Sequence, residues 1–128
     1  MIKILIADDH PIVRQGFKQV LSDTADLVVA DEAGNGQEVL SLAAKKDYDV
    51  ILLDISMPGK NGLEVLKELK LTNPKIPVLI LSIYPEEQYA IRALKAGAAG
   101  YLTKASAPDE LISAIRKVSR GGKYISAS

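Results

Sequence analysis

The stretch that decides the fold is VILLDISMPGKNG, residues 50–62, in which a short apolar run ends at an aspartate. Four successive apolar residues without polar alternation indicate a strand that is buried on both faces. Asp54 stands at the carboxyl end of this strand, and the proline and glycines behind it predict a turn. A buried strand of this kind is typical of a parallel sheet whose functional groups lie at the strand ends.

Similar apolar runs occur elsewhere in the chain, and helical patterns separate them. Val13, Phe17, Val20 and Leu21 recur at the spacing of one helical face. We expect the remaining strands at Ile2–Ala7, Leu27–Ala30, Val78–Leu81 and Gly100–Leu102. We expect the helices from Pro11, after Asn35-Gly36, ahead of Asn73-Pro74, from Pro85 to Lys95, and from Ser106 to Gly121-Gly122.

Strand and helix thus alternate five times, as (βα)5. Short loops between them favour a parallel sheet covered by helices on both sides, which is a doubly wound α/β fold. The length of 128 residues fits one domain. We expect residues 1–122 to form this domain and residues 123–128 to begin a linker.

Composition excludes several kinds of site. There is no cysteine, so the chain has no disulfide, zinc-thiolate site or thiol nucleophile. Sixteen basic and sixteen acidic residues cancel, whereas a module that grips nucleic acid usually carries a basic excess. We therefore expect no direct DNA contact by these residues.

The first apolar run is short and is interrupted by Asp8 and Asp9, so it does not predict a signal peptide. No stretch approaches the roughly 20 apolar residues of a membrane span. A cytoplasmic location without membrane contact is the simplest expectation.

Polar side chains follow four of the expected strands. In an open α/β sheet such residues meet at one edge, because parallel strands share the direction of their carboxyl ends. The residues expected at this edge are Asp8, Asp9, Asp54, Ser82, Thr103 and Lys104.

Three neighbouring carboxylates repel one another unless protons or a cation neutralise them. A set of oxygen ligands without histidine or cysteine suits Mg²⁺, and Mg²⁺ favours phosphoryl chemistry. Asp54 could then act as the nucleophile and form an acyl phosphate. Lys104 would offset the charge on the phosphoryl oxygens, and Ser82 would donate a hydrogen bond to one of them.

The ordered set of Asp8-Asp9, residues 54–62, Ser82 and Tyr101-Leu102-Thr103-Lys104 resembles the receiver domain of response regulators over essentially the whole chain. Three further stretches resemble the LuxR/NarL/FixJ subgroup of transcriptional regulators: residues 8–16, 94–101 and 121–126. The resemblance implies a flavodoxin- or CheY-like five-stranded sheet with strand order 2-1-3-4-5.

The resemblance also implies roles for individual residues. Asp54 would accept a phosphoryl group from a cognate histidine kinase or phosphotransfer protein, opposite Lys104. Asp9, Asp54 and the backbone carbonyl of Ser56 would bind Mg²⁺, and Asp8 would bind it directly or through water. Ser82 and Tyr101 would respond as switch residues.

Phosphorylation would then control homodimerisation and the output to transcription. DNA would be reached only through a C-terminal helix-turn-helix domain beyond these residues. Such a domain is a switch that phosphorylates and slowly dephosphorylates itself, and we expect no turnover enzyme.

The chain departs from the family pattern at three positions. Ser82 stands where many receivers have threonine, so its rotamers are less restricted. Ile83 replaces a residue that is often small, which would crowd the site. Ala105 follows Lys104 where many receivers have a cis proline, and a cis bond to alanine would cost about 2.5–4 kcal/mol.

Structural roles compete with these functional ones. Asp8 and Asp9 could be helix caps, and Tyr101 could be ordinary packing. His10, the single histidine, is expected to serve only the entry into the first helix. Arg116, Lys117 and Arg120 are expected to form a solvated helix face and not a nucleic-acid site.

Three other functions remain as alternatives. The first is a stand-alone receiver that acts by protein contact. The second is an aspartyl phosphatase, but such enzymes commonly carry an aspartate two residues after the nucleophile, where this chain has Ser56. The third is a flavin-binding domain, and the chain lacks the aromatic or hydroxyl-rich loop expected for it.

Overall fold

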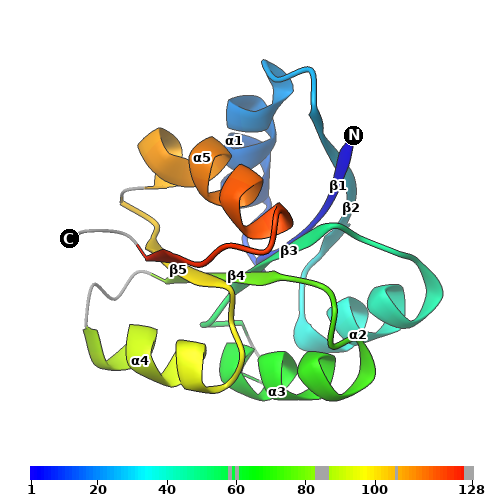
Figure 1. The fold of residues 1–128 in the computed structure, drawn as a ribbon. Coiled ribbons are helices and arrows are strands. Elements are labelled where there is room, and N and C mark those ends of the chain that lie inside the picture. Colours follow the sequence, from blue (N-terminus) through cyan, green and yellow to red (C-terminus); the bar gives the residue numbers. More distant parts are fainter. Residues whose placement is uncertain (58, 60, 83–86, 106, 126–128) are drawn as a thin grey trace.

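A computed structural model describes residues 1–57, 59, 61–82, 87–105 and 107–125 of the chain (Figure 1). Strands and helices alternate as the sequence predicts. In chain order the elements are β1 (Ile2–Ala7), α1 (Pro11–Ser22), β2 (Leu27–Ala33), α2 (Gly36–Lys45), β3 (Val50–Asp54), α3 (Gly62–Thr72), β4 (Val78–Ser82), α4 (Glu87–Lys95), β5 (Gly100–Thr103), α5 (Ala107–Ser119) and β6 (Tyr124–Ile125).

The strands form one parallel sheet in the order β2-β1-β3-β4-β5-β6. The predicted order 2-1-3-4-5 is therefore confirmed. Helices α1 and α5 cover one face of the sheet, and α2, α3 and α4 cover the other (Figure 1). Because the chain winds in opposite directions from β1, the carboxyl ends of β1 and β3 flank the switch point at which such folds bind ligands.

The two central strands supply side chains to two hydrophobic clusters. Every residue of β3 and β4 is buried. On β3, Ile51 and Leu53 pack toward α2, α3 and α4, whereas Val50 and Leu52 pack toward α1 and α5. This alternation explains why the strand sequence has no polar position before Asp54.

Two of the helices begin with an asparagine N-cap. The side chains of Asn35 and Asn61 accept hydrogen bonds from the backbone N–H groups of Glu38 and Glu64, at 2.9 and 3.0 Å. Each asparagine amide also donates to the glutamate carboxylate of the same pair. These contacts satisfy N–H groups that a helix leaves unpaired at its first turn. The predicted starts of α4 at Pro85 and of the α5 cap at Ser106 lie outside the described residues.

The C-terminal segment differs from the prediction of a five-stranded sheet with a linker from residue 123. Tyr124 and Ile125 instead pair in parallel with β5 as a short sixth strand. The Tyr124 hydroxyl also donates a hydrogen bond of 2.6 Å to Glu110 on α5. A side chain at Gly100 would collide with the Tyr124 carbonyl, so glycine permits this close pairing. Sequence patterns miss β6 because two residues carry no periodicity.

Among the helices of the described residues, none combines the length and the apolar character that crossing a membrane requires.

Candidate functional site

The carboxyl edge of the sheet gathers the residues that the sequence places after its strands. Asp54 and Ser82 are the last residues of β3 and β4. Asp8 follows β1 and donates its backbone N–H to Ala33 at 3.0 Å. Lys104 follows β5 and donates its backbone N–H to the carbonyl of Ser82 at 2.7 Å. Continued pairing of the backbone thus places all four side chains at the same edge.

Lys104 lies between two buried acids. Its Nζ is 2.9 Å from Asp8 Oδ2 and 3.2 Å from Asp54 Oδ2. Both carboxylate side chains are 1% exposed, whereas the Lys104 side chain is 18% exposed. One ammonium therefore faces two carboxylates in a site that is largely closed to water.

The orientation of Asp54 is set by the loop that follows it. Asp54 Oδ1 accepts a hydrogen bond from the Ser56 N–H at 3.1 Å, and the Ile55 N–H donates to Leu81 on β4. Gly62 opens α3 and donates its N–H to the Ile55 carbonyl. A Cβ atom on Gly62 would stand 2.5 Å from Ile55 Cα, so only glycine lets α3 approach so closely. Ile55 is thereby tied to β4 through its N–H and to α3 through its carbonyl.

The surroundings shift the protonation of these groups. Burial raises the pKa of the Asp54 carboxyl, an effect that the Ser56 N–H and the Lys104 charge oppose and that Asp8 reinforces. Burial acts to lower the pKa of Lys104, but Asp8 and Asp54 outweigh it and raise the pKa above its usual value. Lys104 accordingly stays charged, and it favours the ionised form of Asp54.

The acidic side chains form a set of ligand atoms suited to a cation. One ligand atom from each of Asp8, Asp9, His10 and Asp54 lies within 4.8 Å of the others. Among the described residues, Asp9 Oδ1 is buried without a hydrogen-bond partner, whereas Asp8 Oδ2 has the Lys104 ammonium 2.9 Å away. Buried oxygens in this condition are costly unless a cation or water satisfies them. The residues present therefore fit Mg²⁺.

Two contacts at this edge were missed by the sequence reasoning. His10 was expected to serve only helix entry, yet its side chain makes no cap hydrogen bond, and its Nδ1 lies against Asp8 and Asp9. Arg14 donates a hydrogen bond to the backbone carbonyl of Asp8 and pairs with Glu32 on β2. The spacing of His10 and Arg14, four residues apart across the first turn of α1, was the available signal.

Other predicted site residues lie close by. Ser82 is buried at the end of β4 and pairs in register with Thr103. Tyr101 is 3% exposed and belongs to the hydrophobic cluster under α4. No cis peptide bond occurs among the described residues, so the bond from Lys104 to Ala105 is trans. Ile83, and with it the predicted crowding, lies outside the described residues.

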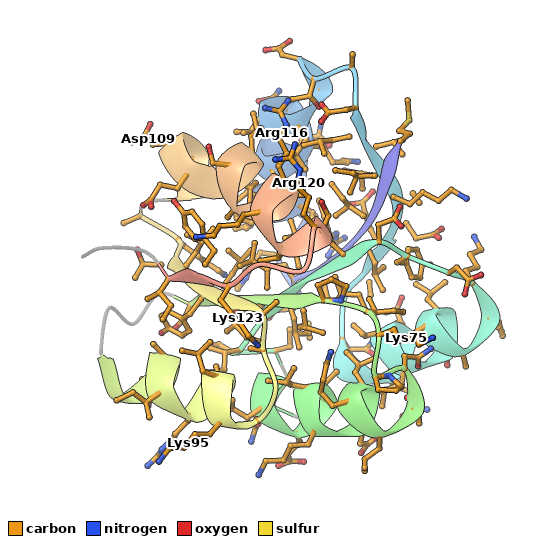
Figure 2. The ribbon with its side chains drawn as sticks, in the orientation of Figure 1. Lys75, Lys95, Asp109, Arg116, Arg120 and Lys123 are labelled. Carbon is orange, nitrogen blue, oxygen red and sulfur yellow. The ribbon has the colours of Figure 1, made fainter. Side chains whose placement is uncertain are left out.

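The basic residues near the end of α5 lie away from the carboxyl edge of the sheet. Figure 2 shows Arg116 on the C-terminal half of this helix and Arg120 just beyond its end at Ser119. Arg116 donates two hydrogen bonds, of 3.0 and 2.9 Å, to the carboxylate of Asp26. Asp26 therefore neutralises one charge of the basic group, Arg116, Lys117 and Arg120, that the sequence analysis identified.

A scan of protein families matches residues 4–116 to the response regulator receiver domain. The chain belongs to this family. The match covers the residues at the carboxyl edge of the sheet, so the geometry described above is that of a receiver domain. These residues are Asp8, Asp9, Asp54, Ser82 and Lys104.

Curated relatives of this receiver domain are regulators of the LuxR/NarL type. It is 41% identical over 98% of its length to the response regulator GacA of Pseudomonas aeruginosa, of which it covers 59%. It is 37% identical over 99% of its length to UvrY of Escherichia coli, of which it covers 58%. The receiver domain thus spans little more than half the length of these relatives.

Solved structures agree with this grouping. A LuxR-family response regulator from Aurantimonas superposes with a TM-score of 0.91 at 31% identity, covering 95% of this chain and 87% of the other. The signal receiver domain of the NarL regulator from Mycobacterium tuberculosis gives a TM-score of 0.88 at 33% identity, covering 94% of this chain and 97% of the other. The fold, the family and the subgroup predicted from the sequence are all confirmed.

Proposed function

We propose that this receiver domain is a phosphorylation switch in which Asp54 accepts a phosphoryl group from a histidine kinase or a phosphotransfer protein. The observation that carries the proposal is the position of Lys104 Nζ, 2.9 Å from Asp8 and 3.2 Å from Asp54. When an anionic phosphoryl group arrives, the Lys104 ammonium can pair with it instead of with the buried Asp54 carboxylate. We expect a cytoplasmic location, where such a phosphoryl donor would act.

In the transfer, a carboxylate oxygen of Asp54 forms a bond to phosphorus while the bond from phosphorus to the donor breaks. The donor retains the electron pair of the broken bond, and the product is an acyl phosphate on Asp54. The Ser56 N–H orients the nucleophile through its hydrogen bond to Asp54 Oδ1. Lys104 compensates the charge that gathers on the phosphoryl oxygens.

Asp8, Asp9, Asp54 and the backbone carbonyl of Ser56 would hold a Mg²⁺ ion, which when bound supplies positive charge to the phosphoryl oxygens. Three carboxylates against one ammonium leave a net negative site that a divalent cation would balance. The buried Asp9 Oδ1, which has no hydrogen-bond partner among the described residues, supports this assignment.

The output of the switch would be regulation of transcription. Ser82 would hydrogen-bond the new phosphoryl group, and Tyr101 on the neighbouring strand would change its packing in response. One relative, of which this chain spans 55%, is a transcriptional regulatory protein, and this chain spans 59% of the response regulator GacA. DNA would therefore be bound by a further C-terminal domain, after phosphorylation-dependent homodimerisation.

We expect slow self-dephosphorylation and no turnover of external substrates. Ser56 stands two residues after Asp54, where an aspartyl phosphatase would need an acid or base. The phosphoryl group would therefore stay on the domain long enough to act as a signal.

The proposal is tested by incubating the domain with Mg²⁺ and a small acyl phosphate, followed by intact-mass measurement. The wild type should gain one phosphoryl group, and Asp54→Asn should gain none. Asp9→Asn should weaken Mg²⁺ binding in a calorimetric titration. Phosphorylation of Asp54→Asn to the wild-type extent would overturn the assignment of the acceptor.

A further inference from the structure

His10 lies against the acids Asp8 and Asp9 at the carboxyl edge of the sheet. Its Nδ1 is 3.2 Å from Asp8 Oδ1 and 3.1 Å from Asp9 Oδ1. Two neighbouring ligands of an octahedral ion at about 2.1 Å from its centre stand roughly 3.0 Å apart. The ring nitrogen and the two carboxylate oxygens are therefore already spaced as ligands that share one ion.

The helix that follows does not explain this position. His10 is the N-cap residue of α1, but its side chain makes no capping hydrogen bond. Its backbone N–H donates to Asp8 Oδ1 at 2.9 Å, which fixes the main chain beside the acid. The imidazole of His10, whose side chain is 64% exposed, lies with Nδ1 at hydrogen-bond distance from Asp8 Oδ1 and takes no part in capping the helix.

A second observation points to a missing ligand at the same place. Asp9 Oδ1 is buried without a hydrogen-bond donor in good alignment, and the atom that lies against it is His10 Nδ1. Asp8 Oδ2 is instead paired with Lys104 Nζ at 2.9 Å, which leaves Asp9 Oδ1 as the buried oxygen without a partner among the described residues. Asp8, Asp9 and His10 belong to the four-residue set whose ligand atoms lie within 4.8 Å of one another.

We propose that His10 is a direct metal ligand through Nδ1, and that it gives the site a preference for first-row transition ions over Mg²⁺. Mg²⁺ favours oxygen ligands, whereas imidazole adds affinity for Mn²⁺ and especially for Ni²⁺. Ligation requires the neutral ring with its proton on Nε2 and the lone pair on Nδ1. The inference rests on the cation site of the proposed function and adds a ligand to it.

The composition of the chain makes the test unusually clean. His10 is the only histidine and the chain has no cysteine, so a protein without an affinity tag has one imidazole and no thiolate. Any imidazole nitrogen detected at a bound ion must then belong to His10. Electron spin-echo modulation of bound Mn²⁺ reports such a nitrogen directly, independently of phosphorylation.

The experiment combines this spectrum with calorimetric titrations of Mg²⁺ and Ni²⁺. The wild type should show nitrogen modulation, and His10→Ala and His10→Gln should lose it. His10→Ala should weaken Ni²⁺ binding by about tenfold or more, since even partners outside the first coordination shell are worth 10–100-fold. Its Mg²⁺ affinity should change by less than about threefold. Ile12→Ala, which truncates a side chain that is 87% exposed nearby, is the control and should change neither affinity.

The outcomes separate the two proposals. Absence of nitrogen modulation in the wild type, or equal loss of Mg²⁺ and Ni²⁺ affinity in His10→Ala, would overturn the role of His10. In that case Asp9→Asn would still weaken Mg²⁺ binding. If the wild type bound no Mg²⁺ and Asp9→Asn changed nothing, the cation site of the proposed function would fail instead.

Discussion

Replacing Lys104 with methionine tests whether its ammonium balances the buried acids. Methionine keeps an unbranched apolar side chain and removes the charge. Asp8 and Asp54 would then lose the cation that lies 2.9 and 3.2 Å away, in positions where each side chain is 1% exposed. Removing one partner of a buried ion pair costs about 3–5 kcal/mol. Because the Lys104 side chain is 18% exposed, solvent screening reduces this, and we expect about 2–3 kcal/mol at neutral pH.

The loss should depend on pH in a defined direction. Burial already raises the pKa of Asp54, and the charge of Lys104 opposes that rise. Without Lys104 the folded-state pKa of Asp54 moves further above its unfolded value. A carboxyl of this kind stabilises the fold at acidic pH and loses that contribution as pH rises through its folded pKa. The deficit of Lys104→Met should therefore be largest above the folded pKa of Asp54 and shrink as the solution becomes more acidic.

Urea denaturation of the wild type and Lys104→Met at several pH values without divalent ions measures this deficit. Lys67→Met, at an exposed lysine on α3, is the matched control and should cost little at any pH. A deficit in Lys104→Met that stayed constant with pH, or a variant as stable as the wild type at neutral pH, would show that Lys104 does not balance the acids.

Three further predictions concern other parts of the fold. Gly100→Ala should displace β6 by forcing a Cβ against the Tyr124 carbonyl, at a cost of about 1–3 kcal/mol, seen as faster amide exchange at Tyr124 and lower stability in urea. Asn61→Ala should remove the α3 cap and cost about 0.5–2 kcal/mol in the same assay, and an unchanged midpoint would contradict the capping role. Arg116→Gln should raise the pKa of Asp26, because the hydrogen bonds from Arg116 now lower it. In the wild type, any stability from this pair is lost only as pH falls through the lowered pKa of Asp26. An NMR titration of the Asp26 carboxyl that showed no upward shift in the variant would mean that the pair is absent in solution.

The sequence predicted the strands best where both of their faces are buried. Unbroken apolar residues identified β3 and β4 to within one residue, since no polar position interrupts them. Strand β2 extends to Ala33, three residues beyond the predicted end at Ala30. As the edge strand beside β1 it exposes alternate side chains, among them Glu32, and the partly buried Asp31 accepts a hydrogen bond from the Tyr48 hydroxyl, so neither acid marks the end of the strand.

The site was predictable to the extent that topology determines it. Parallel strands present their carboxyl ends at one edge, and this rule alone is enough to bring Asp8, Asp54 and Lys104 together. The ring of His10 could not be placed in this way. Its contact with the acids depends on the backbone angles at the N-cap, where φ is −103° and ψ is 111°, and no sequence periodicity encodes these angles.

Because β3 is buried on both faces, its register in the sheet depends on the polar residues at its two ends. A slip of one residue would exchange the side chains of Val50 and Ile51 between two clusters that are both apolar, so hydrophobicity alone discriminates weakly against it. The slip would, however, draw Asp49 or Asp54 into the hydrophobic interior. Asp49 is bound at the opposite end of the strand, where it accepts the Lys3 N–H at 2.8 Å. The two aspartates therefore delimit the strand, and the residue proposed to receive the phosphoryl group also specifies the alignment of the sheet that holds it.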